Sequence, residues 1–314
     1  MRLQTLLMTA ALALSLGGCG AADPAPAKSA DPQVGAAGAS VATLYSQGWL
    51  SVETVGNGPD VILLPGLSSA STVWDATVAA LKDDYRLHRV DIAGFAGQQT
   101  GEPRDDIIAG LADDLATYID TQSGNAPILI GHSMGGFTAL HVSRDLGDRV
   151  RAAVIVDSLP FYPLILDPNA TADSVRPQAE AMIAQMRALP KPAYDAMQAQ
   201  MVTRLSKNTA AQTRIAQWSA ESDRDVVLDA MAELMMTDMR PQLADIVPPI
   251  TVIYAHDPLM GLPPETVDAL YASAYSGVPQ LTLTRVDESF HFIMDDQPDA
   301  FLTALRQALS HHEQ

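Results

Sequence analysis

The segment at residues 131–135, Gly-His-Ser-Met-Gly, restricts the fold of this chain more than any other feature. It follows a short apolar run at residues 126–130, which is typical of a buried parallel strand. It leads into residues 134–142, whose pattern predicts a helix that ends near Gly147. A serine between a strand and a helix lies on a sharp turn that exposes its hydroxyl, and the flanking glycines let the two backbones approach. The segment therefore predicts a nucleophilic Ser133 at the edge of a parallel sheet.

Strand-like and helix-like segments alternate along most of the chain. Apolar runs typical of strands lie at residues 61–64, 86–91, 128–130, 152–156, 250–254 and 280–286, with helical patterns at 72–82 and 104–122. This alternation predicts an α/β fold in which helices cover both faces of a mostly parallel sheet. Alternating residues at 48–55, followed by a Gly-Pro turn, predict an antiparallel strand or hairpin at its start.

The alternation stops between residues 159 and 247, where the pattern is helical and rich in methionine. We expect this stretch to form a helical cap inserted after the sixth strand, above the strand ends. Its methionines could line an adaptable apolar pocket or simply pack the cap helices together. The expected organisation is a signal segment at 1–18, a tether at 19–44 and a single α/β domain at 45–314 that includes the cap at 159–247.

The N-terminal residues predict export and a lipid anchor. The apolar run from Leu6 to Leu16 follows a basic residue and is too short to span a bilayer. The sequence Leu-Gly-Gly-Cys that ends at Cys19 resembles the signal of bacterial lipoproteins, in which the cysteine becomes the lipid-bearing N-terminus. Gly20 after it favours the outer membrane, facing the periplasm. The alternative is an ordinary cleaved secretion signal with an incidental cysteine.

Composition narrows the class of partner. Hydrophobic residues make up 47% of the chain, enough for a sizeable core, and the formal net charge is −18. Nucleic acid is therefore not expected as a partner, because phosphate binding requires clustered Lys and Arg. The sequence contains no metal-ligand cluster and no dinucleotide-binding glycine pattern, so we expect no metal and no cofactor. The expected partners are a small-molecule acyl substrate and, through Cys19, a membrane.

A serine nucleophile needs a base, and the base needs an acid that orients it. His291 follows the last expected strand, in a loop that enters a helix, and is the candidate base. Asp257 and Asp157 each follow a predicted strand, at the edge where a parallel sheet presents chemistry. The order Ser, Asp, His suits both acids. We favour Asp257, with Asp157 as the alternative.

The negative charge that develops on the substrate oxygen needs hydrogen-bond donors. The backbone N–H of Met134, directly after the candidate nucleophile, is one candidate donor. The loop at residues 65–69 follows an earlier strand, and Gly66 permits a tight turn that would direct the N–H of Leu67 to the same place. The sequence thus predicts an oxyanion hole formed by Leu67 and Met134.

Together these parts resemble the α/β-hydrolase superfamily, in particular its capped serine esterases, over about residues 48–309. Residues 90–98 are similar to the family segment Asp-x-x-Gly-x-Gly-x-Ser, with Ala96 and Gln98 in place of a glycine and the serine. The family's His-Gly in the oxyanion loop is Pro-Gly here, at residues 65–66. The acid loop, commonly Gly-x-x-Asp, is one residue shorter before Asp257.

The resemblance implies cleavage of a carboxylic ester through an acyl-enzyme formed on Ser133. Aminopeptidases and carbon–carbon bond hydrolases use the same parts, so both remain alternative activities. A non-catalytic binding module on the same fold is an alternative of another class. Haloalkane and epoxide hydrolases of this superfamily have Asp at the position of Ser133, which argues against those activities here.

Overall fold

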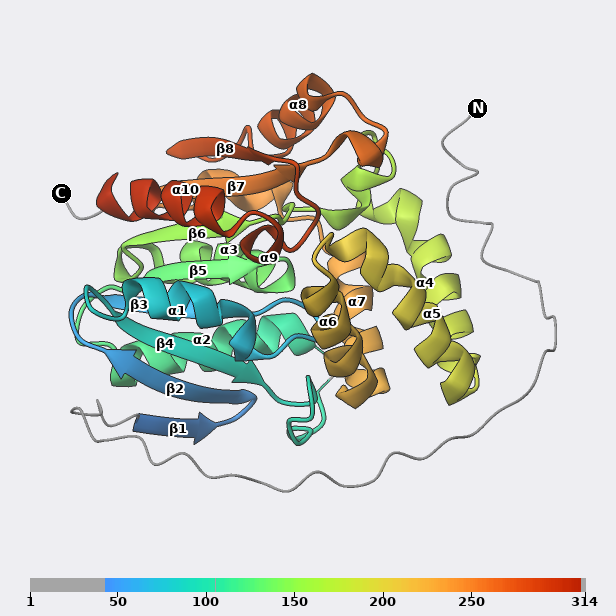
Figure 1. Cartoon of the computed structure of the whole chain (residues 1–314), viewed down its shortest axis with the longest axis horizontal. Helices are drawn as coiled ribbons and strands as arrows, with labels where there is room; N and C mark the ends of the chain where they lie inside the picture. Colours follow the sequence, from blue (N-terminus) through green and yellow to red (C-terminus); the bar gives the residue numbers. More distant parts are fainter. Residues whose placement is uncertain (1–42, 105, 312–314) are drawn as a thin grey trace. The chain divides into compact units, whose positions relative to one another are not determined.

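The computed structural model describes residues 43–104 and 106–311 (Figure 1). The expected signal segment, Cys19 and nearly all of the expected tether lie outside these residues. The tether was expected to reach residue 44, but the first strand already begins at Thr43 and pairs with the second strand. Among the described residues, no helix has the length and apolarity needed to cross a membrane.

One eight-stranded sheet organises the described residues, in the order β1-β2-β4-β3-β5-β6-β7-β8. Its strands are β1 (Thr43–Gln47), β2 (Leu50–Gly56), β3 (Asp60–Leu64), β4 (Arg86–Ile92), β5 (Ile128–His132), β6 (Ala152–Val156), β7 (Ile250–His256) and β8 (Leu281–Asp287). β2 pairs antiparallel with β1 and β4, and every pair from β4 to β8 is parallel. The expected parallel sheet with an antiparallel hairpin at its start is confirmed.

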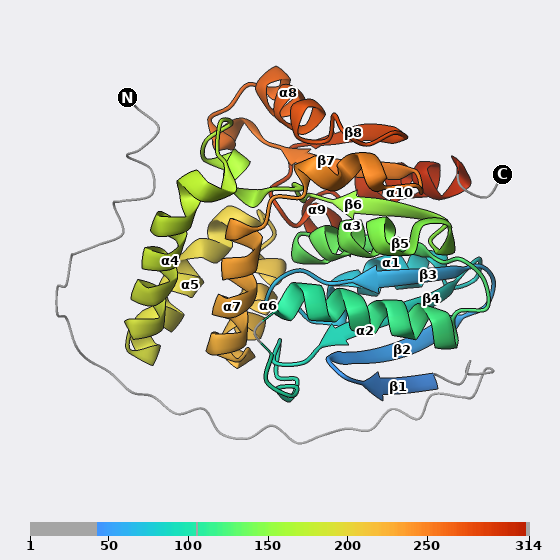
Figure 2. The same ribbon diagram turned by 180° about the vertical axis from the view of Figure 1, so that it is seen from behind.

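Helices cover both faces of this sheet (Figures 1 and 2). They are α1 (Asp75–Leu81), α2 (Ile107–Gln122), α3 (Met134–Leu146), α8 (Pro264–Ala274), α9 (Ile293–Asp296) and α10 (Pro298–His311), with short 3-10 turns η1 (Ser71–Trp74), η2 (Gly147–Arg149), η3 (Tyr162–Ile165), η4 (Arg240–Asp245) and η5 (Pro258–Met260).

The fully buried strand β3 shows how the two faces arise. Successive side chains of a strand point to opposite faces. Ile62 and Leu64 therefore belong to the core beneath α2 and α3, whereas Val61 and Leu63 belong to the core beneath α1 and α10. A strand buried on both faces is read in sequence as a continuous apolar run, which is why β3, β5 and β6 were recognisable.

The cap consists of α4 (Ala172–Ala188), α5 (Lys191–Leu205), α6 (Thr209–Glu221) and α7 (Arg224–Met236). They lie between β6 and β7 in the chain and stand at the end of the sheet to which β5 and β6 point (Figure 1). α4 packs on α7, and α5 packs on α6. A small core of the cap gathers four of its methionines, Met182, Met186, Met197 and Met231. For these four residues, packing of the cap helices is the interpretation that the structure supports.

His141 is a titratable group in the middle of α3. Its ring packs on Phe137, with the ring centroids 5.0 Å apart. Its Nε2 is buried and has no hydrogen-bond partner within residues 43–104 and 106–311. Burial, with the nearby Arg144 charge, lowers the pKa of His141 to about 4. The folded protein therefore holds this imidazole neutral.

This depressed pKa predicts a pH-dependent stability. At pH values between about 4 and the ordinary histidine pKa, His141 binds a proton more readily in the unfolded chain than in the folded protein. Its contribution to the free energy of unfolding is therefore complete above the ordinary pKa and is lost as the pH falls below it. Between about pH 8 and about pH 5 the free energy of unfolding should fall by about 2 kcal/mol more in the wild type than in His141→Gln. Urea unfolding of both proteins measures the difference. Equal losses would contradict a depressed pKa at His141.

Candidate active site

Ser133 lies on the turn between β5 and α3, as expected. Its backbone has φ 53° and ψ −121°, a conformation that residues with a side chain rarely adopt. The turn is held by hydrogen bonds from the Ser133 N–H to the Val156 carbonyl (2.9 Å) and from the Phe137 N–H to the Ser133 carbonyl (3.0 Å). A Cβ on Gly131 would collide with the Gly135 carbonyl. Both glycines are therefore required for the close contact that forms this turn.

The loop at residues 65–69 lies against the same turn. A Cβ built on Gly66 would lie 2.9 Å from Nδ1 of His132 and 3.2 Å from Cβ of Ser133, so the loop backbone contacts the turn directly. The loop closes through a hydrogen bond from the Ser69 N–H to the Gly66 carbonyl (3.1 Å), and Ser68 has φ 62°. Leu67, the expected oxyanion donor, lies inside this loop.

Met134, the other expected donor, is the first residue of α3. The first N–H groups of a helix have no acceptor within the helix, so they are free to bind an anion. Nothing in the described part of the chain accepts a hydrogen bond from the N–H of Met134 or of Leu67. Two unpaired backbone donors thus flank Ser133 from α3 and from the β3 loop.

His291 follows β8 and forms a hydrogen bond with Asp157, with 2.7 Å between Nδ1 and Oδ2. The other oxygen of this carboxylate, Oδ1, accepts hydrogen bonds from the Ala255 N–H (2.9 Å) and the Tyr271 hydroxyl (3.0 Å). Asp157 has φ 45°, and its N–H donates to the Ile253 carbonyl (2.8 Å). A carboxylate can only accept, so the proton is assigned to Nδ1 of His291 and the lone pair to Nε2.

Asp257, the favoured acid in the sequence, does not pair with His291. Its Oδ2 lies 2.6 Å from Nζ of Lys207 in the cap, and its Oδ1 accepts a hydrogen bond from the Leu259 N–H (2.8 Å). Burial opposes ionisation of Asp257, but the hydrogen bonds from Lys207 and Leu259 outweigh it and hold its pKa below the ordinary value. The alternative acid, Asp157, is the one that contacts the imidazole.

His132 ties the His291 loop to the serine turn. Its Nε2–H donates to the His291 carbonyl (3.0 Å), and the two imidazole rings lie with their centroids 4.5 Å apart. Burial, followed by the proximity of His291, holds the pKa of His132 well below its ordinary value. A neutral imidazole next to His291 adds no positive charge there. His132, the last residue of β5 and the neighbour of Ser133 in the chain, thus holds the backbone of His291.

Sequence reasoning missed two groups that hold Asp157. The Tyr271 hydroxyl comes from α8, and burial together with the Asp157 charge holds its pKa well above the ordinary value, so it remains a donor. The Ala255 N–H comes from β7. Neither residue belongs to a local motif, so only the strand order could have indicated them. Among the described residues, no group of three or more His, Cys, Asp or Glu side chains is arranged to hold a metal ion.

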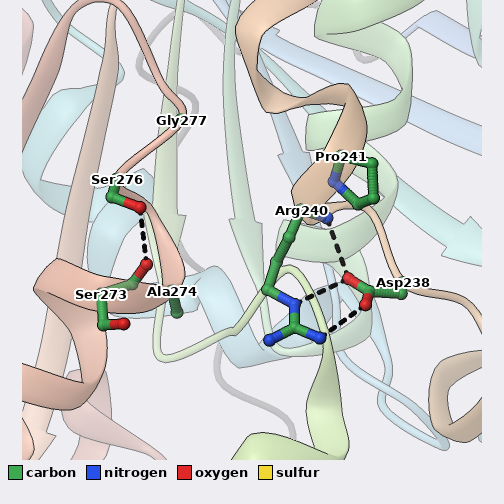
Figure 3. Close-up of a pocket in the computed structure, with 7 residues that line it drawn as sticks. All are labelled: Asp238, Arg240, Pro241, Ser273, Ala274, Ser276 and Gly277. Atoms are coloured by element: carbon green, nitrogen blue, oxygen red, sulfur yellow. Dashed lines mark hydrogen bonds and ion pairs between the residues drawn. The ribbon is translucent and has the colours of Figure 1, made fainter. Parts of the chain in front are cut away.

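A polar pocket of about 430 Å³ lies between η4 and α8 (Figure 3). Its cation, Arg240, is neutralised by Asp238 through contacts of 2.6 and 2.9 Å and donates to the Ala170 carbonyl (2.9 Å). Its lining residues are Asp238, Arg240, Pro241, Ser273, Ala274, Ser276 and Gly277. None of them belongs to the group around Ser133, so this pocket is separate from the candidate active site.

Comparison with known proteins agrees with this architecture. The family model described as "Alpha/beta hydrolase family" matches residues 61–304. A pimeloyl-[acyl-carrier protein] methyl ester esterase from Nitrosomonas europaea is 34% identical over 113 residues, 36% of this chain and 42% of that protein. One from Aeromonas hydrophila is 32% identical over 36% and 43%. The matched regions thus span less than half the length of these relatives.

Solved structures show the same fold. An esterase from Thermogutta terrifontis has a TM-score of 0.68 at 22% identity, covering 84% of this chain and 94% of that one. The enol-lactonase from Burkholderia xenovorans has a TM-score of 0.68 at 19% identity, covering 83% and 96%.

The pairing of His291 can be tested without reference to activity. We expect Asp157→Asn to remove or shift the hydrogen-bonded Nδ1–H proton resonance of His291, because the charged acceptor is lost. Asp257→Asn is the matched control and should leave this resonance in place. Proton spectra of protein labelled with ¹⁵N-histidine report both. A resonance that survives Asp157→Asn unchanged and disappears in Asp257→Asn would reverse the assignment.

Proposed function

Because the chain belongs to the alpha/beta hydrolase family, we propose that it is a serine hydrolase that cleaves a carboxylic ester through Ser133, His291 and Asp157. The observation that carries this proposal is the 2.7 Å hydrogen bond between Asp157 and Nδ1 of His291, beside a strained Ser133 turn. Relatives described as methyl ester esterases support an ester as the substrate class.

The proposed reaction follows from the tautomer of His291. Its Nε2 lone pair takes the proton from the Ser133 hydroxyl as the serine oxygen attacks the ester carbonyl. The N–H groups of Leu67 and Met134 donate hydrogen bonds to the oxyanion. The tetrahedral intermediate collapses, the C–O bond breaks, and the alcohol leaves with the proton from Nε2. Water, deprotonated by the same nitrogen, then attacks the acyl-enzyme. The bond from the acyl carbon to the Ser133 oxygen breaks, the acid is released, and Nε2 returns the proton to this oxygen.

Asp157 contributes by orientation and charge. Its hydrogen bond fixes the tautomer of His291 and stabilises the imidazolium that forms when Nε2 takes the serine proton. The donors from Ala255 and Tyr271 keep one carboxylate oxygen occupied, so the other remains aligned with Nδ1. This arrangement is the reason why Asp157, and not Asp257, is proposed as the acid.

Kinetics of three variants test the proposal. Ser133→Ala should abolish both hydrolysis and labelling by a fluorophosphonate probe, because the probe requires an activated serine. Asp157→Asn should lower kcat by roughly 10⁴-fold by favouring the wrong tautomer, whereas Asp257→Asn should cost far less. The assay uses p-nitrophenyl esters of rising chain length, with amino-acid amides alongside. If the folded wild-type protein is not labelled by the probe, a non-catalytic binding module is supported instead. If amides are cleaved in preference to esters, an amide replaces the ester as the proposed substrate class.

We also propose that the protein is exported and anchored by a lipid on Cys19, in the outer membrane facing the periplasm. The support is the lipoprotein-like sequence that ends at Cys19, the only cysteine of the chain.

Fractionation of a bacterial host tests the anchor. The native protein should sediment with outer membranes and incorporate labelled fatty acid, since the chain of a lipid provides the membrane affinity. The Cys19→Ala variant should carry no labelled fatty acid and should leave the membrane fraction. The lipid anchor would be excluded if this variant stayed in the membrane and the native protein carried no label.

A further inference from the structure

The cap helix α6 is connected at both ends to loops of the candidate active site. We propose that α6 is a positioning element: the segment before it holds the His291 loop, and Ser222 after it holds the oxyanion loop. The effect on catalysis rests on the proposed function, but the effect on the position of His291 can be measured without an activity assay.

At the first end, Asp296 joins the His291 loop to the segment between α5 and α6. Its Oδ2 accepts a hydrogen bond from the Phe290 N–H (2.9 Å). Its Oδ1 accepts hydrogen bonds from the Ser206 hydroxyl (2.6 Å), the Lys207 N–H (2.9 Å) and the Asn208 N–H (3.3 Å). One carboxylate thus binds the residue before His291 and three consecutive residues of the cap.

The residue after His291 is held by the same segment. The Phe292 N–H donates to the Leu205 carbonyl (2.9 Å) at the end of α5. Lys207 adds a hydrogen bond to the Glu288 carbonyl in the same loop (3.1 Å). Both backbone neighbours of His291 are therefore tied to the cap, one directly and one through Asp296.

At the second end, the Ser222 hydroxyl joins two loops of the sheet. It accepts hydrogen bonds from the Ala96 N–H (2.8 Å) and from the Ser68 hydroxyl (3.2 Å), and it donates to the Trp218 carbonyl (2.7 Å). Ser68 directly follows Leu67 and has φ 62°. A strained turn needs surrounding contacts to persist, and Ser222 supplies one of them.

The helix between these two ends is firmly seated. α6 has 13 residues, corresponding to about 20 Å. Asn208 caps its first turn, and Ile215 and Trp218 are buried in the core beneath α1 and α10. Arg214 forms a bidentate ion pair with Asp295 (2.7 and 2.8 Å), the neighbour of Asp296. A displacement of α6 would therefore be transmitted to both loops.

None of these residues would touch the reacting atoms, so their expected effect is on alignment. Misplacement of a catalytic group by about 1 Å can cost about 10²-fold in rate. Removing a contact from one end of α6 should therefore lower kcat more than it changes KM, because these loops carry groups that act mainly on the transition state.

Ser222→Ala tests the oxyanion end. We expect kcat to fall by roughly tenfold to a hundredfold with KM changed less than about threefold, and the rate of fluorophosphonate labelling to fall in parallel. Ser222→Thr, which keeps the hydroxyl, should recover most of the activity. Ser219→Ala is the matched control, because its hydroxyl lies in the same helix and accepts a hydrogen bond from Gln198 of α5 (3.3 Å) rather than from a loop of the sheet. Its kinetics should match those of the wild type.

Asp296→Asn tests the His291 end, with Asp299→Asn in α10 as the control for charge removal from an exposed site. In the folded Asp296→Asn variant, the Nδ1–H resonance of His291 should broaden or shift, while urea unfolding confirms that the fold persists. The control should leave this resonance unchanged.

The two proposals fail in different ways. A wild-type protein without labelling or turnover would overturn the proposed function, whereas the His291 resonance would still report on α6. Wild-type kinetics in Ser222→Ala together with an unchanged His291 resonance in Asp296→Asn would overturn the role of α6 alone. If Ser222→Ala and Ser222→Thr lose activity equally, the hydroxyl does not position the loop.

Discussion

The close contact of α3 with the ends of β3 and β5 is the constraint from which the candidate site follows. Gly131 and Gly135 meet there without side chains between them, and a Cβ on Gly135 would lie 2.6 Å from the Pro65 carbonyl. Within this dense backbone packing Ser133 adopts a positive φ of 53°, which residues with a side chain rarely do. It also places the loop that contains Leu67 directly against the serine. The candidate nucleophile and its expected oxyanion donors therefore share a single packing arrangement.

The fold and the serine could be predicted because both are encoded locally. Buried strands such as β3 and β6 appear as apolar runs, and the serine turn needs glycines at fixed spacing. His291 was also recognisable, because it follows the last strand and precedes a helix. These features depend on residues that are close in sequence, so a single chain contains the information.

The carboxylate that pairs with His291 could not be chosen from the sequence, because the pairing is set by the arrangement of strands in space. Asp157 and Asp257 follow neighbouring strands, β6 and β7, which are paired in parallel. Asp157 turns towards His291 because the β7 backbone at Ala255 and the Tyr271 hydroxyl bind its other oxygen. Asp257 is occupied by Lys207, a cap residue distant in sequence. The choice depends on these long-range contacts, which no local pattern reports.

Residues with side chains adopt positive φ at five positions of the described chain, and most of them belong to loops discussed above: Ser68, Ala96, Ser133, Asp157 and Glu288. Each such conformation costs on the order of 1–3 kcal/mol, a considerable fraction of the roughly 5–15 kcal/mol by which proteins are stable. The hydrophobic cores on the two faces of the sheet must therefore be stable enough to offset this local strain. Mutations that relax these turns would raise the free energy of unfolding but would misplace the loops of the candidate active site. Thermal stability and activity should therefore oppose each other during the evolution of this chain.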